Sequence, residues 1–515
     1  MSSTSCDRHA QADVQTVKDM TVGFLPLDTR PCTYDLPVQL ARQSGAQVLL
    51  PPQGLVAPYK QASDTAALAR WLEETAPGCD ALVVSAEQLL QGGLIPSRQA
   101  RVSAARQCEA LQVLARIRRK APSARIYLSN VLMRTSISTL DPESLVWWEK
   151  VNLYSKLCYR AKTGRCSEAA QQCRALEQEI PAEVLRTFLT ARGTNHRVNR
   201  ECIRLAAEGV VDELLILQED CAPEGLQRFE QETLLRDIQA GGLSDRVFLF
   251  NGTDEAGAEL LQRALHPGGC AVEVVWLGRQ PDFVAKYEDR PFRENLAEHM
   301  RALCMRQEQG ARRVLFVLTP KQEQREASLP RSKAPHDYSE AELRAICRTI
   351  GQAAAQGRSC YLLDLDFANG GNPFLLECLA KELPIAQLWG YAAWNTASNA
   401  LGTLLAQILA GDQGNGALNR AFTAERVLDD AVYQAIVRQA VAARVKAEGQ
   451  DVYNIRDIPQ TQRWLQQEFE AVRPLLEAIF GGEVPAFEAR LRWPRLFEAA
   501  VFTRAGGGPV YTENF

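Results

Sequence analysis

Two short apolar segments, at residues 360–363 and 385–388, each run into a cluster of acidic, amide and aromatic side chains. The side chains after the first segment are Asp364, Asp366 and Asn369, and those after the second are Trp394, Asn395 and Asn399. Because Asn395 and Asn399 are four residues apart, one face of a helix would carry both amides. Carboxylates can transfer protons, and amides with an indole can hold a polar ligand, so this cluster is a candidate active site.

Similar polar motifs follow apolar segments elsewhere in the chain. Carboxylates come after the segments at 22–25, 81–85, 213–217 and 247–250, and arginines or a double glycine accompany several of them. Parallel strands gather ligands at their carboxyl ends, so these motifs predict one shared concave site. The predicted catalytic acids are Glu87, Asp220, Asp254, Glu255 and Asp366. The predicted ligand-binding residues are Asp28, Arg30, Gly92, Gly93, Arg98, Arg134, Asn369, Trp394, Asn395 and Asn399.

Paired carboxylates, amides and an aromatic ring are the groups that glycoside hydrolysis uses. One acid protonates the leaving oxygen, and another serves as base or nucleophile. We therefore expect a hydrolase of the glycosidase type, acting on a small sugar or glycoside in a cleft between two lobes, with no cofactor. One alternative is a hydrolase of amides or phosphates with a divalent cation at Asp220, Asp364 and Asp366. Another is a sugar- or small-acid-binding protein, in which every carboxylate would be paired with an arginine.

Several of these motifs also have a purely structural interpretation. Asp254 and Glu255 would suit the first turn of a helix, where acids favour the helix dipole. Asn395 could cap its own helix while Trp394 lies in the core. An aspartate and an arginine between prolines, as at 26–31, could simply brace a turn.

Ten apolar segments of strand length alternate with helical segments, which predicts parallel sheets wrapped in helices. The segments are 22–25, 48–50, 81–85, 125–128, 213–217, 247–250, 272–277, 314–318, 360–363 and 385–388. We expect two Rossmann-like α/β units followed by a helical C-terminal region, with an elaborated (β/α)8 barrel as the alternative. The expected parts are a disordered leader at 1–20, an α/β domain at 21–270 with a helical insertion at 141–207, a second α/β domain at 271–412, and the helical region at 413–515. Trp493 and Phe497 would anchor a last helix.

The composition is that of a soluble globular protein, with 515 residues, 46% apolar, 23% charged and a net charge of −4. There is no long basic block to favour nucleic-acid binding, and no apolar run reaches the roughly 18 residues of a membrane span. The fourteen cysteines show no C-x-x-C spacing, and the five histidines are isolated, so no zinc site is expected. With no secretory signal in the first 20 residues, we expect a cytoplasmic protein with reduced thiols.

Five motifs together are similar to those of one bacterial family. They are P-L-D-x-R-P at 26–31, S-x-E-x-L-x-x-G-G-L-x-x-S-R at 85–98, G-x-D-E at 252–255, A-N-G-G at 368–371, and G-Y-A-x-W-N-T-x-x-N-x-L-G at 390–402. The chain resembles the family catalogued as domain of unknown function 4127 over nearly its whole length. Two acids depart from the family pattern, because Glu219 and Glu87 stand where it has aspartates. The resemblance implies a fold and a site, and it names no reaction.

Overall fold

The computed structural model describes residues 20–278, 281–328, 337–411 and 416–512, so the leader expected at 1–20 lies almost wholly outside the described residues. The chain forms two compact units. Unit 1 comprises the residues up to Thr29 together with 46–267 and 287–290. Unit 2 comprises 30–45, 268–286 and the chain from Pro291 onward. The chain therefore leaves and re-enters each unit instead of forming them strictly one after the other.

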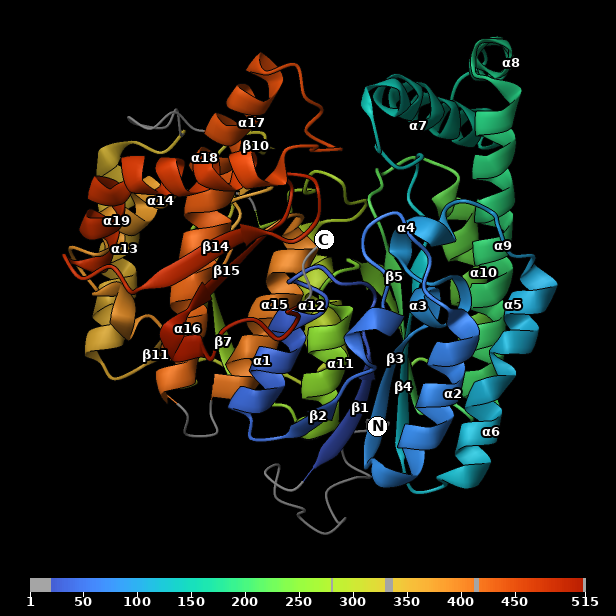
Figure 1. Cartoon of the computed structure of the whole chain (residues 1–515), viewed down its shortest axis with the longest axis horizontal. Coiled ribbons are helices and arrows are strands. Elements are labelled where there is room, and N and C mark those ends of the chain that lie inside the picture. Colours follow the sequence, from blue (N-terminus) through green and yellow to red (C-terminus); the bar gives the residue numbers. More distant parts are fainter. Residues whose placement is uncertain (1–19, 279–280, 329–336, 412–415, 513–515) are drawn as a thin grey trace. The chain divides into compact units, whose positions relative to one another are not determined.

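Unit 1 is built on a six-stranded parallel sheet with the strand order β2-β1-β3-β4-β5-β6 (Figure 1). Its strands are β1 (Thr21–Leu25), β2 (Gln47–Leu49), β3 (Ala81–Ser85), β4 (Arg125–Leu132), β5 (Glu213–Gln218) and β6 (Val247–Asn251). The strand order reverses between β1 and β3, and ligands of such sheets bind at this switch point, beyond the carboxyl ends of the strands. The motifs that contain Asp28 and Glu87 follow these two strands.

β4 is longer than the strand that its apolar segment predicts. The expected end was residue 128, but the strand continues through Ser129 and Asn130 to Leu132 because these residues pair with β5. The buried Asn130 side chain donates to Asn199 Oδ1 (3.0 Å) on α9 (Ala182–Ala207). A partner far along the chain thus satisfies polar groups that would otherwise end a buried strand.

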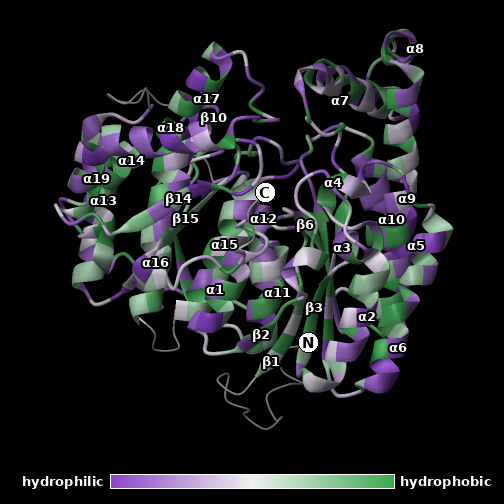
Figure 2. Ribbon diagram, viewed as in Figure 1, coloured by the Kyte–Doolittle hydropathy of each residue, from purple (hydrophilic) through white to green (hydrophobic). Residues whose placement is uncertain are grey.

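Helices cover the sheet of unit 1. One core forms between the strands and α2 (Thr65–Thr75), α6 (Gln112–Lys120), α9 and α10 (Gln227–Ala240), while α11 (Ala256–Leu265) packs against β3 and β4. The hydrophobic colouring of β3 in Figure 2 matches its complete burial. The segment expected as a helical insertion contains α7 (Pro142–Lys162), α8 (Ala169–Glu179) and α9, which share a smaller core.

Unit 2 repeats the same strand order on a second parallel sheet, β13-β11-β9-β7-β8. The strands are β7 (Ala271–Trp276), β8 (Arg306–Gln307), β9 (Arg313–Leu318), β11 (Ser359–Asp364) and β13 (Gly390–Ala392). Side chains alternate between two buried faces. Phe316 and Leu362 point into one core, and Leu315 and Leu363 point into the other. Burial on both faces explains why these strands read as continuous apolar runs.

The two cores of unit 2 are completed by different helices. One core lies under α13 (Glu340–Ala355), α14 (Pro373–Leu379), the π-helix η7 (Val427–Val437), α17 (Arg438–Ala447), α18 (Ile458–Ala471) and α19 (Arg473–Phe480). The other lies under α12 (Phe292–Ala302) and α15 (Ala397–Ala410). α1 (Asp35–Gln43) and α16 (Gly416–Arg426) also belong to this unit, and β10 (Arg325–Glu326) pairs with β12 (Phe367–Ala368).

Two sequence-based expectations in unit 2 are wrong. Residues 385–388 are not a strand, because Ile385–Gln387 forms a 3-10 helix after Pro384 and the strand β13 starts only at Gly390. The tail does not end in a helix anchored by Trp493 and Phe497. These residues instead connect the two strands of an antiparallel hairpin, β14 (Phe487–Leu491) and β15 (Ala499–Thr503), which pair along their whole length.

The expected α/β class, with parallel sheets flanked by helices, is confirmed. Among the described residues, no helix combines the length and the apolar character needed to cross a bilayer.

Candidate active site

Asp364 and Asp366 form a pair of buried acids at the carboxyl end of β11. Asp364 is the last residue of the strand and is 0% exposed. Its carboxylate accepts hydrogen bonds from the Tyr391 hydroxyl (3.0 Å), the Asn372 amide (2.8 Å) and the Asp366 amide (3.3 Å). These donors hold the Asp364 carboxylate in one orientation beside its neighbour.

Asp366 has the environment of a proton donor. Burial, aided by the nearby charge of Asp364, raises the pKa of Asp366 to about 7. Burial raises the pKa of Asp364 only to about 6, because its hydrogen bonds oppose the effect. No lysine or arginine within the described ranges forms a salt bridge with either carboxylate. One acid of the pair can therefore be protonated near neutral pH while the other is ionised.

The glycine-rich loop after β12 encloses this pair. A Cβ on Gly371 would overlap the Tyr391 hydroxyl and would lie 3.0 Å from the Asp364 carboxylate, so only glycine fits. Asn372 caps α14 by accepting the Phe374 amide (3.1 Å), and its side-chain amide donates to Asp366 (3.3 Å). The same asparagine thus starts a helix and positions the candidate acid.

Asn369 and Asn395 both adopt left-handed backbone conformations, with φ of 61° and 62°. The Asn369 amide donates to the Asn395 carbonyl (2.9 Å) and joins the two loops. Because α15 begins at Ala397 with Thr396 as its N-cap, Asn395 lies outside the helix. The expectation that Asn395 and Asn399 share a helical face is therefore wrong. Non-glycine residues in this conformation are uncommon and recur at ligand sites.

Trp394 is 7% exposed, and its ring centre lies 6.1 Å from that of Phe497. Asn399 is buried within the first turn of α15, where its amide donates to Thr396 Oγ1 (3.4 Å). Only Asn369 and Asn395 of the predicted amides are partly exposed. These two are therefore better placed to meet a ligand than Asn399.

Asp430 on the π-helix η7 belongs to this site although sequence reasoning missed it. Its carboxylate accepts the Ala393 amide (2.9 Å) and Arg426 Nη1 (2.8 Å), and its carbonyl accepts the Gly371 amide (2.8 Å). π-helical segments are rare and frequently occur at functional sites. The spacing of Arg426, Asp429 and Asp430 in the sequence could have indicated a buried ionic group. The same spacing is also typical of an ordinary ion pair on the surface of a helix.

A second acidic group lies at the strand ends of unit 1. Glu87 accepts the Val131 amide (2.6 Å) and the Ser85 hydroxyl (3.1 Å), and burial raises its pKa to about 7. The adjacent acids Glu219 and Asp220 are paired with arginines. Arg98 binds Glu219, and Arg134 binds both acids. The acid–arginine pairs suit ligand binding or structure, whereas Glu87 suits proton transfer.

The remaining predicted residues of unit 1 lie in loops that follow the strands. Gly92 has φ of 75° and lies against the Ser63 backbone, so it is required by the turn, and Gly93 has φ of 133°. Asp28 and Asp254 are buried at the ends of β1 and β6. In unit 2, Arg30 lies 5.6 Å from the Trp493 ring centre and 3.8 Å from Glu498.

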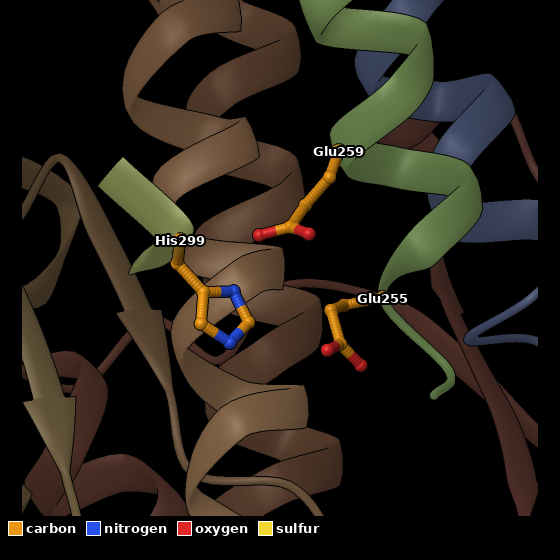
Figure 3. A group of neighbouring side chains, drawn as sticks. All are labelled: Glu255, Glu259 and His299. Atoms are coloured by element: carbon orange, nitrogen blue, oxygen red, sulfur yellow. The ribbon is translucent and has the colours of Figure 1, made fainter. Parts of the chain in front are cut away.

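Glu255 and Glu259 lie one turn apart at the start of α11 (Figure 3). Glu255 accepts the Thr253 amide (2.9 Å), and a carboxylate oxygen of each glutamate lies within 4.8 Å of the other. Carboxylate oxygens close together are the ligands that divalent cations prefer. Asp364 and Asp366, two of the three metal ligands considered from sequence, lie in unit 2, and the third, Asp220, lies in unit 1.

The predicted site residues divide between the units. Those of unit 1 are Asp28, Glu87, Gly92, Gly93, Arg98, Arg134, Asp220, Asp254 and Glu255, and those of unit 2 are Arg30, Asp366, Asn369, Trp394, Asn395 and Asn399. Within unit 2, the loops carrying Asp366, Asn369 and Asn395 come together. That all of these residues face one ligand stays a prediction.

The fold and this site define a class of α/β proteins with parallel sheets, in which buried acids occupy the ends of the strands. Within that class, the chain belongs to the family described as a protein of unknown function (DUF4127), whose model matches residues 22–501. No curated protein matches the chain.

Proposed function

We propose that this protein is a hydrolase of the glycosidase type, with Asp366 as its general acid. The observation that carries the proposal is that Asp366 is buried beside a second acid, Asp364, and that this environment raises the pKa of Asp366 to about 7. A general acid works best when its pKa is close to the working pH. Its substrate would be a small sugar or glycoside.

Asp364 is the second carboxylate of the proposed mechanism. Its negative charge, next to Asp366, favours the protonated form of Asp366. Asp366 gives its proton to the glycosidic oxygen as the bond between that oxygen and the anomeric carbon breaks. Water then forms a bond to the anomeric carbon and gives a proton to the Asp366 carboxylate, which restores the acid. Asn372 orients Asp366 throughout, because it donates to the Asp366 carboxyl from a fixed helix start.

Two other functions are alternatives. A binding protein without catalysis would pair its acids with arginines, as Glu219 and Asp220 are paired, but Asp364 and Asp366 have no such partner in the described chain. For a metal-dependent hydrolase of amides or phosphates, the difficulty is that N–H and O–H donors already occupy the Asp364 oxygens. A cation would have to displace these donors.

The test compares aryl glycosides that differ in how much their leaving group needs a proton. Asp366→Asn should lower kcat/KM for 4-methylumbelliferyl glycosides by about 100-fold or more, within the usual range for a general acid. For 2,4-dinitrophenyl glycosides, whose leaving group departs without a proton, the loss should be below about tenfold. Asp457→Asn is the matched control, because Asp457 is an exposed N-cap and asparagine caps helices equally well.

Equal losses of kcat/KM for the two kinds of glycoside would show that Asp366 is not the general acid. Binding of sugars without any turnover by the unmodified protein would support the binding alternative. Activity abolished by EDTA and restored by a divalent cation would support the metal alternative.

A further inference from the structure

The connection between β14 and β15 carries Phe497, whose ring lies near two guanidinium groups. The guanidinium carbon of Arg438 lies 5.0 Å from the Phe497 ring centre, and that of Arg495 lies 5.8 Å from it. Arg438 is the first residue of α17, directly after the π-helix. Stacking on an aromatic face holds a guanidinium in a defined plane.

The two arginines differ in their charge partners. Arg495 is paired with Glu498 (Nε to Oε2, 2.7 Å). Arg438 has neither a salt bridge nor a hydrogen bond to any residue that the structure describes, and its buried Nε has no acceptor. Burial lowers the pKa of Arg438. Arg438 is half-buried, and a partly desolvated cation without an acid partner is unfavourable, so an anionic ligand would relieve this cost.

The acids whose charges act on Arg438 already bind other groups. Glu498 binds Arg495, and Asp429 binds Arg426 (3.1 Å). Glu326 accepts Lys286 Nζ (3.1 Å) and Asn369 Nδ2 (2.7 Å). Each acid therefore has a closer donor than Arg438, and the free donors of Arg438 remain available for a ligand.

Arg438 is connected to the candidate general acid through one helix face and one loop. Asp430, Gln434 and Arg438 follow one another at intervals of four residues along the helix. Gln434 donates to the Phe497 carbonyl (3.0 Å), and its Cβ would lie 2.9 Å from a Cβ on Gly370. Asp430 accepts the Gly371 amide. The loop that encloses Asp366 thus packs against the π-helix η7, which Arg438 directly follows.

From this arrangement we propose that Arg438 and Phe497 form a subsite for a negatively charged substituent, so that the ligand is an acidic saccharide. A sugar carboxylate, a sulfate ester and a phosphate ester share the required chemistry, because each offers two oxygens to a planar guanidinium. The proposal rests on the proposed function, since it names the class of saccharide that the same site would accept.

The test measures binding by titration calorimetry and does not require turnover. The probes are methyl glucuronide, glucose 6-sulfate and glucose 6-phosphate, with methyl glucoside as the neutral reference. The unmodified protein should bind at least one charged probe at least tenfold more tightly than methyl glucoside. Arg438→Gln should remove this preference while leaving the affinity for methyl glucoside within about twofold, and Arg438→Lys should keep part of it. The strongest of the three charged probes identifies the substituent.

Arg463→Gln is the matched control, because Arg463 is an exposed arginine of unit 2 that hydrogen-bonds only Gln460 among the described residues. It should leave every affinity unchanged. A charged preference that survives in Arg438→Gln, or no preference in the unmodified protein, would overturn the subsite. If charged saccharides bind through Arg438 but no glycoside is hydrolysed, the subsite stands and the hydrolase proposal fails. If neutral glycosides are hydrolysed and charged saccharides bind no more tightly than methyl glucoside, the hydrolase proposal stands and the subsite fails.

Discussion

At the scale of single residues, Asp366 shows how burial sets a protonation state. An aspartate in water loses its proton near pH 4, but Asp366 is 5% exposed and lies beside a second acid. Both effects favour the neutral form of Asp366. Between about pH 4 and pH 7, the folded protein therefore binds a proton that the unfolded chain releases. The same property that makes Asp366 a candidate general acid should therefore be visible in the stability of the protein.

The free energy of unfolding should fall as the pH rises from about 4 to about 7. Because the pKa of Asp366 is raised from 3.8 to about 7 on folding, its contribution is present below pH 4 and is lost as the pH passes through 7. At roughly 1.4 kcal/mol per pKa unit, the loss is at most about 4 kcal/mol. Asp366→Asn, which resembles the protonated acid, should flatten this slope, as measured by urea unfolding at several pH values.

The control for this experiment is again Asp457→Asn, which should keep the slope of the unmodified protein. An unchanged slope in Asp366→Asn would mean that Asp366 is already ionised at neutral pH. The proposed general acid would then lack its proton.

At the scale of elements, the π-helix η7 is held by a buried ionic group. Arg426 binds both Asp429 (3.1 Å) and Asp430 (2.8 Å), and all three side chains are buried. Asp430 in turn binds the backbone at Ala393 and Gly371, on the two loops beside the candidate acids. Removing the arginine would leave two buried carboxylates without their cation.

Arg426→Met should lower the free energy of unfolding at pH 8 by about 3–5 kcal/mol, the usual cost of breaking a buried ion pair. The loss should be smaller at pH 5, because burial already raises the pKa of Asp430 and the two acids can take up protons once the arginine is gone. Urea unfolding at both pH values measures this difference.

Arg473→Met is the comparison variant, because Arg473 makes only exposed helical pairs, and its effect should stay below about 1 kcal/mol. A loss in Arg426→Met that is the same at both pH values would point to lost packing instead of uncompensated charge.

At the scale of the whole molecule, the state of the cysteines tests the expected compartment. All thirteen cysteines within the described residues are free thiols. Cys158 on α7 and Cys173 on α8 nevertheless lie with their sulfur atoms 2.7 Å apart. Burial raises the pKa of Cys173 far above the usual range, so this thiol stays protonated and resists oxidation by air.

Protein purified without reductant and then unfolded should therefore titrate close to fourteen thiols. When the folded protein is first treated with diamide, which oxidises thiol pairs, peptide mapping should find a Cys158–Cys173 disulfide and the number of thiols should fall by at least two. The variant Cys158→Ser should lose two fewer thiols than the unmodified protein. A much lower number before oxidation would contradict the expectation of reduced thiols.

Much of the fold could be predicted because a buried parallel strand is visible as a short run of consecutive apolar residues. The segments at 81–85 and 213–217 coincide closely with β3 and β5, since each is a continuous apolar run buried on both faces. The prediction of strand ends and of the C-terminal structure failed where residues far away in the sequence determine the local conformation. β4 extends through Asn130 because β5 and Asn199 satisfy it, and the tail forms a hairpin because β14 and β15 pair with each other.

The sequence by itself determined the α/β class, the positions of most strands, and the acids and amides at their ends, because each of these depends on a few consecutive residues. Only the tertiary structure decided which acid has a raised pKa and that Arg438 has no acid partner among the described residues. Burial under a loop and the neighbouring Asp364 raise the pKa of Asp366, and each acid near Arg438 has a closer donor. Desolvation and charge depend on distances in space, and those distances exist only after residues far apart in the chain have been brought together.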